Sequence, residues 1–318
     1  MSDGGMLSRL AESLYWIGRY VERADDTARI VDAYVHRVME DPFNDEDAAC
    51  RSLFAILGVD VDEAGQVTIA QVLEHLVFDT ANPSSISGSL AAAHENARRA
   101  REAISSEMWV CLNAANNELP RRRSLAASLG PATYLEFIRE RAALFTGLAG
   151  ATMSHDDGWQ FLVLGRNLER IDMTARLLEG RLVAAEHSPD WLTLLRASGA
   201  MESFLRASSG LAEPQDIASF LLLDRLFPRS AYHALSTADA CLEQIAPPDT
   251  RFGVTDQARR TIGRARNRLE YADPRRLVED LPELLGFLER SCAEANDEVT
   301  ARYFRQVEVV MWESEEQT

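Results

Sequence analysis

Lysine is absent from this 318-residue chain, so all 33 of its basic residues are arginines. Without lysine the chain cannot form a Schiff base with a carbonyl substrate. It also lacks the residue that contacts the phosphates of ATP in a Walker A loop. We therefore do not expect an autonomous ATP site of the usual kind.

Motifs that bind metals or perform redox chemistry are missing too. The four cysteines lie far apart in the sequence, at Cys50, Cys111, Cys241 and Cys292. No Cys-x-x-Cys pair occurs, which argues against a zinc knuckle or a thioredoxin-like site. None of the six histidines belongs to a His-Glu-x-x-His motif or has a glutamate three residues before it, so the zincin and helical di-iron signatures are absent. The sequence therefore predicts no metal site and no cofactor.

Long apolar runs are absent as well. No run approaches the ~20 residues that span a bilayer, and the first residues lack the basic and apolar regions of a signal peptide. Acidic residues outnumber basic ones by 50 to 33, which gives a net charge of −17. Because nucleic-acid binding depends on neutralising phosphates with basic side chains, we expect neither a nucleic-acid nor a membrane partner. The missing signal peptide and membrane span lead us to expect a cytoplasmic protein.

The apolar residues that are present follow a helical period. From Leu14 onward they recur at alternating steps of three and four, as a helix stripe facing other helices requires: Leu14, Ile17, Val21, Ala24, Ala28, Val31, Val35 and Val38. This pattern predicts a helix over residues 8–40, and similar patterns predict helices over 47–57, 69–80, 84–117 and 134–147, with 121–123 in a loop. The predicted fold class is all-α.

One segment occurs twice. Residues 18–29 read GRYVERADDTAR and residues 165–176 read GRNLERIDMTAR, with eight of twelve positions identical at an offset of 147. Such self-similarity is typical of a duplicated structural unit. The sequence therefore predicts two tandem, pseudo-repeated helical-bundle units, residues 1–152 and 153–318, packed into one body.

The repeated segment carries the charged residues of greatest interest. On a helix, Glu22 and Arg29 lie along one flank of the apolar stripe, with Arg19 and Arg23 further round. In the second copy Glu169 and Arg176 lie along the flank, with Arg166 and Arg170 beside them. Glu22 and Arg29 are two turns apart, so we expect each to find its partner on another helix. Glycine weakens a helix interior, so its presence at Gly18 and Gly165 suggests that another backbone or a ligand approaches closely.

Three interpretations of these eight residues remain open. They can form a partly buried ion-pair network between the two units, because the planar guanidinium of arginine binds a carboxylate through two hydrogen bonds. They can instead line a cleft that binds a carboxylate-bearing amino acid or peptide. They can also form a surface on which another protein docks.

Residues 6–29, MLSRLAESLYWIGRYVERADDTAR, resemble the opening of the bacterial Alpha-E domain family, named for a Glu-Arg motif that would here be Glu22-Arg23. The resemblance extends to residues 82–86, 94–101, 105–109 and 223–230, and thus spans nearly the whole chain. It implies a helical fold. Members of this family are typically encoded beside, or fused to, a circularly permuted ATP-grasp ligase. Transglutaminase-like proteins and a proteasome-like hydrolase are frequent neighbours.

These neighbouring and fused proteins imply a role in ATP-dependent amide-bond formation. Because the chain has no lysine and no phosphate loop, the ligase would hold the ATP. The expected function is a non-catalytic helical partner or scaffold subunit that docks the ligase and presents a carboxylate-bearing substrate. The alternative is a peptide or amide transferase or hydrolase with Glu22 or Glu169 as general acid/base. The adjacent Arg23 and Arg170 argue against it, because they would lower the carboxyl pKa.

Overall fold

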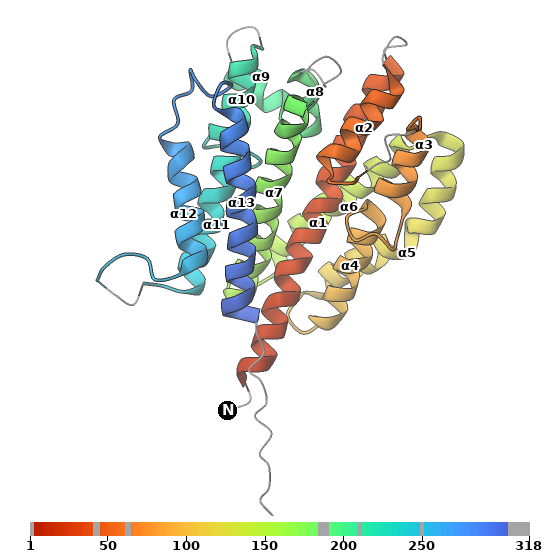
Figure 1. Cartoon of the computed structure of the whole chain (residues 1–318). Helices are drawn as coiled ribbons and strands as arrows, with labels where there is room; N and C mark the ends of the chain where they lie inside the picture. The colour runs from red at the N-terminus through yellow and green to blue at the C-terminus, as the bar shows by residue number, and fades with distance from the viewer. Residues whose placement is uncertain are drawn as a thin grey trace, which may run out of the picture.

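The computed structural model of the chain describes residues 3–40, 45–60, 65–183, 191–208, 212–248 and 251–304. Every regular element in these ranges is a helix, which confirms the all-α class. Among them, none is both long and apolar enough to cross a membrane. Figure 1 shows the helices side by side, with the two long helices α1 and α7 adjacent in the middle.

The first half of the chain begins with the longest helix. Its helices are α1 (Asp3–Glu40), α2 (Glu46–Ile56), α3 (Ile69–Val72), α4 (Ile86–Arg99), α5 (Ser106–Leu129) and α6 (Ala132–Thr152), with a π-helical turn at Leu73–Phe78. The second half contains α7 (Asp157–Val183), α8 (Trp191–Ala197), α9 (Met201–Ala207), α10 (Pro214–Leu223), α11 (Ala231–Ile245), α12 (Gln257–Glu270) and α13 (Leu281–Val299), followed by a π-helical turn at Thr300–Phe304.

Two predictions about the region after Pro83 are wrong. The single helix expected over 84–117 is divided into α4 and α5, because Ser105 begins a new helix by accepting a hydrogen bond from the amide of Met108 at 3.2 Å. Residues 121–123, expected in a loop, lie inside α5, which continues past Pro120 to Leu129. There the guanidinium of Arg122 lies over the ring of Phe137 of α6, 4.1 Å from its centroid. This contact helps to hold the last turns of α5 in place.

Helix α1 is the centre of the molecule. It packs against α4 and α6 of its own half and against α7, while α7 packs against α11 and α13. The shorter helices cross over, because α2 also lies against α7 and α8 lies against α1. The two halves are therefore joined by one long helix pair and by two shorter helices that reach across it (Figure 1).

The predicted apolar stripe of α1 is buried from Leu14 to Val35, and Val38 is half-buried. Side chains outside the stripe are buried too, among them Tyr15 and Tyr34, at 0% and 1% exposure. A helix buried on more than one face is surrounded by other helices rather than lying on a surface. This position forces the charged residues of α1 into the interior as well.

The backbones of α1 and α7 approach closely at two glycines. A Cβ atom built on Gly18 would lie 2.1 Å from the carbonyl oxygen of Leu162, and one built on Gly165 would lie 2.1 Å from the carbonyl oxygen of Tyr15. No side chain fits at such distances. Of the two explanations for these glycines, a neighbouring backbone is therefore the correct one.

Alanine at either contact glycine should force the two helices apart. We expect Gly18→Ala and Gly165→Ala each to lower the free energy of unfolding by roughly 1–3 kcal/mol, the usual cost of overpacking. Gly147→Ala is the matched control, because Gly147 lies in α6 with no atom within 4 Å of the added Cβ. It should raise stability by up to ~1 kcal/mol. Urea unfolding followed by circular dichroism measures all three, and equal effects would contradict the close approach.

Candidate functional site

The repeated Glu-Arg motifs face each other across the contact between α1 and α7. Arg23 donates from Nε to Oε1 of Glu169 at 2.5 Å and from Nη2 to Oε2 at 3.0 Å. Arg170 donates from Nε to Oε1 of Glu22 at 2.6 Å and from Nη2 to Oε2 at 3.2 Å. Each helix thus provides the arginine for the other helix's glutamate. The pairing is two-pronged in both directions, the strongest geometry for this pair of side chains.

A further arginine completes the surroundings of each glutamate. Arg19 donates from Nε to Oε2 of Glu169 at 2.7 Å and from Nη1 to Oδ1 of Asn296 on α13 at 2.9 Å. At Glu22 the corresponding partner is Arg229, which precedes α11 and lies 3.0 Å from Oε1. Both glutamate side chains are almost fully buried, at 3% exposure for Glu22 and 1% for Glu169.

Arg166 stands apart from the other seven residues of the motif. At an offset of 147 it corresponds to Arg19, yet it forms no ion pair with any described residue, and its Nε atom is buried without a hydrogen-bond partner. Burial and the neighbouring Arg170 lower the pKa of Arg166. Arg229 occupies the position beside Glu22 that symmetry would give to Arg166. The sequence analysis missed this residue, although it lies in the segment 223–230 that carries the family resemblance.

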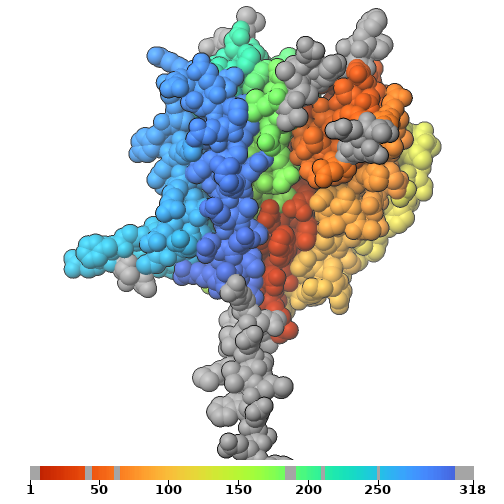
Figure 2. Space-filling view, viewed as in Figure 1, coloured from red at the N-terminus to blue at the C-terminus, as the bar shows by residue number. Residues whose placement is uncertain are grey.

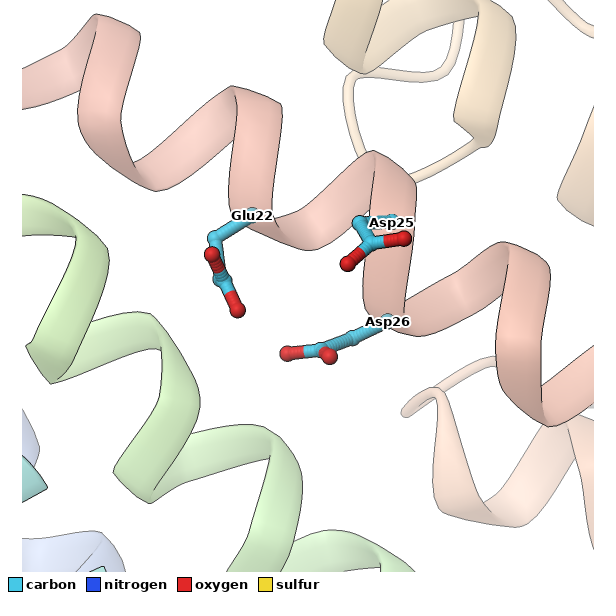
Figure 3. A group of neighbouring side chains, drawn as sticks. All are labelled: Glu22, Asp25 and Asp26. Carbon is cyan, nitrogen blue, oxygen red and sulfur yellow. The ribbon is translucent and has the colours of Figure 1, made fainter. Parts of the chain in front are cut away.

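Three buried carboxylates lie together on α1. Glu22, Asp25 and Asp26 place oxygens within 4.8 Å of one another, a spacing that could hold a metal ion. Figure 3 shows the carboxylates of Glu22 and Asp26 pointing from α1 toward α7. Arg229 forms ion pairs with all three carboxylates. Its guanidinium therefore supplies the positive charge that a bound cation would otherwise provide.

The surrounding charges decide the protonation of these carboxyl groups. Burial alone would raise the pKa of Glu22, but Arg170 and Arg229 outweigh it and lower the pKa to about 2. Burial is outweighed in the same way at Glu169, whose pKa is lowered by Arg19 and Arg23. Both glutamates are therefore ionised at neutral pH and hold no proton to donate. A general acid or base needs a pKa near the working pH, so this environment does not suit either role.

Arg29 and Arg176 find their first partners on their own helices. Arg29 donates to Asp25 at 3.1 Å and Arg176 donates to Asp172 at 2.9 Å, one turn earlier in each case. The expectation that Arg29 pairs only with another helix is therefore wrong, because the aspartate one turn away was overlooked.

The same two arginines also reach the opposite half. A Cβ on Gly199, in the turn after α8, would lie 3.0 Å from Nη1 of Arg29. A Cβ on Gly58, in the turn after α2, would lie 2.9 Å from Nη1 of Arg176. Both glycines have positive φ, at +64° and +69°, a conformation that other residues rarely adopt. Each arginine thus packs against a glycine turn of the other half.

Little space remains beside the paired motifs. The cavity that adjoins Asp26, Arg170 and Arg229 has a volume of about 20 Å³, enough for about one water molecule. An amino acid does not fit there. Arg29 borders a more open cleft of about 450 Å³, which it lines together with His36 and Arg139 among others. Ligand or partner binding by the eight motif residues stays a prediction, and Arg29 is placed best for it.

The fold and the buried Glu-Arg ion pairs define a helical protein whose two halves are joined through reciprocal contacts between α1 and α7. The Alpha-E family, described as a predicted alpha-helical domain with a conserved ER motif, matches residues 6–304. The chain therefore belongs to the Alpha-E family. Glu22-Arg23 and Glu169-Arg170 are the Glu-Arg pairs that the structure brings together.

Similar proteins occur in mycobacteria. An uncharacterized protein of Mycobacterium bovis is 25% identical over 92% of this chain, and an uncharacterized protein of Mycobacterium tuberculosis (strain H37Rv) is 24% identical over the same share. The chain spans 36% of the length of these relatives. No solved structure matches the chain.

Removing one partner of the buried pairs should be costly. Glu169→Gln leaves Arg19 and Arg23 without their common carboxylate, so we expect a loss of ~3–5 kcal/mol in unfolding free energy, typical of a broken buried pair. Glu95→Gln is the control, because Glu95 also binds two arginines, Arg98 and Arg99, but its side chain is 40% exposed. It should cost far less than Glu169→Gln, because solvent screens ion pairs at the surface. Equal losses in urea unfolding would refute a buried network.

Asp26 should make stability depend on pH. Burial, helped by Glu22 and Asp25, outweighs Arg229 and raises the pKa of Asp26 to about 7. Between pH ~4, where aspartate ionises in an unfolded chain, and pH 7, the folded protein therefore binds a proton that the unfolded chain has lost. This contribution stabilises the fold at low pH and disappears as the pH rises through 7.

Asp26→Asn should remove that contribution. Relative to the variant, the wild type should lose unfolding free energy between pH 5 and pH 8 in matched urea titrations. A difference between the wild type and Asp26→Asn that stays constant from pH 5 to pH 8 would show that Asp26 is ionised throughout, because neither the folded nor the unfolded state would then bind a proton at this residue.

Proposed function

We propose that this chain is a non-catalytic helical partner of an ATP-grasp-type amide ligase, on which it acts as a binding or scaffold subunit. The observation that carries the proposal is that arginines of the protein already bind the glutamates of both Glu-Arg motifs. Glu22 and Glu169 are buried, and each is bound by two arginines. The residues that would have to perform acid/base chemistry thus hold the fold together.

We further propose that the two halves, residues 1–152 and 153–318, are copies of one helical unit. Buried positions support this. In α4 and α11 they match at an offset of 145, as in Leu90 and Leu235 or Ala97 and Leu242. In α5 and α12 the offset is 150, as in Leu112 and Ile262, Ala115 and Ala265, or Leu119 and Leu269.

The turns before α4 and α11 support the same proposal. Ser85 caps α4 by accepting a hydrogen bond from the amide of Gly88, and its hydroxyl donates to the carbonyl oxygen of Asp79. Ser230 caps α11 through the amide of His233 and donates to the carbonyl oxygen of Asp224. Two unrelated segments would not be expected to share both contacts at one offset.

The length of the relatives supports a subunit role. Because this chain corresponds to 36% of the relatives' length, the unit works within a longer chain in those proteins. The identity of the partner rests on the family resemblance, which also brings in a transglutaminase-like protein and a proteasome-like hydrolase as further candidates. The chain itself has no lysine for a phosphate loop, so the ligase would bind the ATP.

The rival function, a peptide or amide transferase or hydrolase with Glu22 or Glu169 as general acid/base, is not favoured. It requires a carboxyl group that exchanges a proton near neutral pH. The arginines around both glutamates lower their pKa values instead. The cavity that adjoins Asp26, Arg170 and Arg229 has a volume of about 20 Å³, too small for an amino acid or peptide.

Co-purification tests the proposal. A tagged form of the chain, expressed together with an ATP-grasp ligase of the kind encoded beside members of this family, should recover the ligase as a stable complex. Adding the purified chain should raise the ligase's turnover, while the chain alone should not act on acyl-amino acids or peptides. The absence of both a complex and a change in ligase turnover would exclude this function. Turnover by the chain alone that is lost in Glu22→Gln would favour the rival.

A further inference from the structure

Helix α12 is strongly basic in an acidic protein. Its fourteen residues include five arginines, Arg259, Arg260, Arg264, Arg266 and Arg268, and one acidic residue, Glu270, at the end. The whole chain, by contrast, has a net charge of −17. Helix α12 lies at the outer edge of the molecule, on the side away from the first half (Figure 2). Three of its arginines, Arg260, Arg264 and Arg268, are exposed to solvent.

A cleft of about 370 Å³ lies beside this helix. Its lining contains four arginines but one acidic residue, Asp239. Asp239 of α11 binds Arg259 at 2.9 Å and Arg266 at 2.6 Å. These pairs hold two of the guanidiniums in fixed positions against the body of the protein.

The other two arginines of the cleft keep their charge available. Arg260 and Arg264 are exposed and form no ion pair with any residue that the structure describes. Arg260 donates to the carbonyl oxygen of Val254 and to the side-chain oxygen of Gln257, both uncharged. The cleft therefore retains an excess of positive charge, which attracts a negatively charged ligand.

Helix packing does not require these arginines. Helix α5 buries positions that match those of α12 at an offset of 150. At the same offset, α5 has Val110 and Ala114, both exposed, where α12 has Arg260 and Arg264. A helix can therefore fill this place in a bundle with neutral residues outside. The arginines have to be explained by something other than the fold.

Gly263 is the second unusual feature of the cleft. It lies in the middle of α12, where glycine costs up to ~1 kcal/mol relative to alanine. Unlike Gly18 and Gly165, it has no atom within 4 Å of an added Cβ, so packing does not demand it. The missing side chain leaves the helix backbone open between Arg260 and Arg264. An extended chain can approach the helix closely there.

We propose that this cleft binds a carboxylate-rich peptide segment. Arginine forks bind carboxylates through two hydrogen bonds each, and two arginines one turn apart match carboxylates on a chain rather than a single ion. Tyr271, directly after α12, is 85% exposed. Its ring offers an apolar contact that a peptide can use and free phosphate cannot.

The inference rests on the proposed function for the source of the segment, an acidic substrate or product of the ligase. Its test needs only this chain. Fluorescein-labelled hexaglutamate is titrated with the full-length protein, and binding is followed by fluorescence anisotropy. The double variant Arg260→Gln with Arg264→Gln should weaken binding at least tenfold.

A matched control separates the cleft from bulk charge. Arg98→Gln with Arg99→Gln removes the same charge from exposed positions on α4, where both arginines bind Glu95 of their own helix. This variant should change the affinity by less than twofold. Circular dichroism melts verify that both double variants stay folded.

Three results would overturn the inference. The wild type could fail to bind hexaglutamate, both double variants could weaken binding equally, or tripolyphosphate could bind more tightly than the peptide. None of these results bears on the ligase complex, so co-purification of the α12 double variant with the ligase tests the proposed function separately.

Discussion

The structure depends on two reciprocal ion pairs between the parallel helices α1 and α7. Arg23 of α1 binds Glu169 of α7, and Arg170 of α7 binds Glu22 of α1. Charges buried this deeply are tolerated only when they are paired and hydrogen-bonded. The pairs can form because glycines bring the two backbones together one turn below. Separating the two halves of the chain would leave every one of these charges unpaired.

The two ion pairs are related by symmetry, but the residues around the two glutamates differ. Glu169 is completed by Arg19, whose guanidinium is also held by Asn296. Glu22 is completed by Arg229, which binds Asp25 and Asp26 as well. Arg166 consequently loses its expected role. The second half also differs on its outer face, where α12 carries arginines that α5 lacks. The two halves therefore share the paired glutamates and arginines but differ in the residues around them.

Much of this arrangement could be predicted from the sequence, because helical periodicity and a repeated segment are local signals. They predicted α1 and its buried stripe, and they drew attention to Glu22, Arg23, Glu169 and Arg170, which form the reciprocal ion pairs. The boundary between α4 and α5 was missed because it depends on one capping serine inside a periodic stretch. Arg229 was missed because it lies 207 residues from Glu22 in sequence, and only the packing of α11 on α7 brings them together. The pairing of Arg29 with Asp25 was available in the sequence and was overlooked.

Native-state hydrogen exchange tests most directly whether the contact between α1 and α7 holds the molecule together. Elements at the centre of a cooperative fold exchange their amides only through global unfolding. The account predicts that amides around residues 18–30 and 165–177 exchange last, with one common free energy that equals the global value from urea unfolding. If either segment exchanged through a lower-energy opening while the outer helices of both halves stayed protected, the halves would be stable without this contact. The paired Glu-Arg motifs would then not be the feature on which the fold depends.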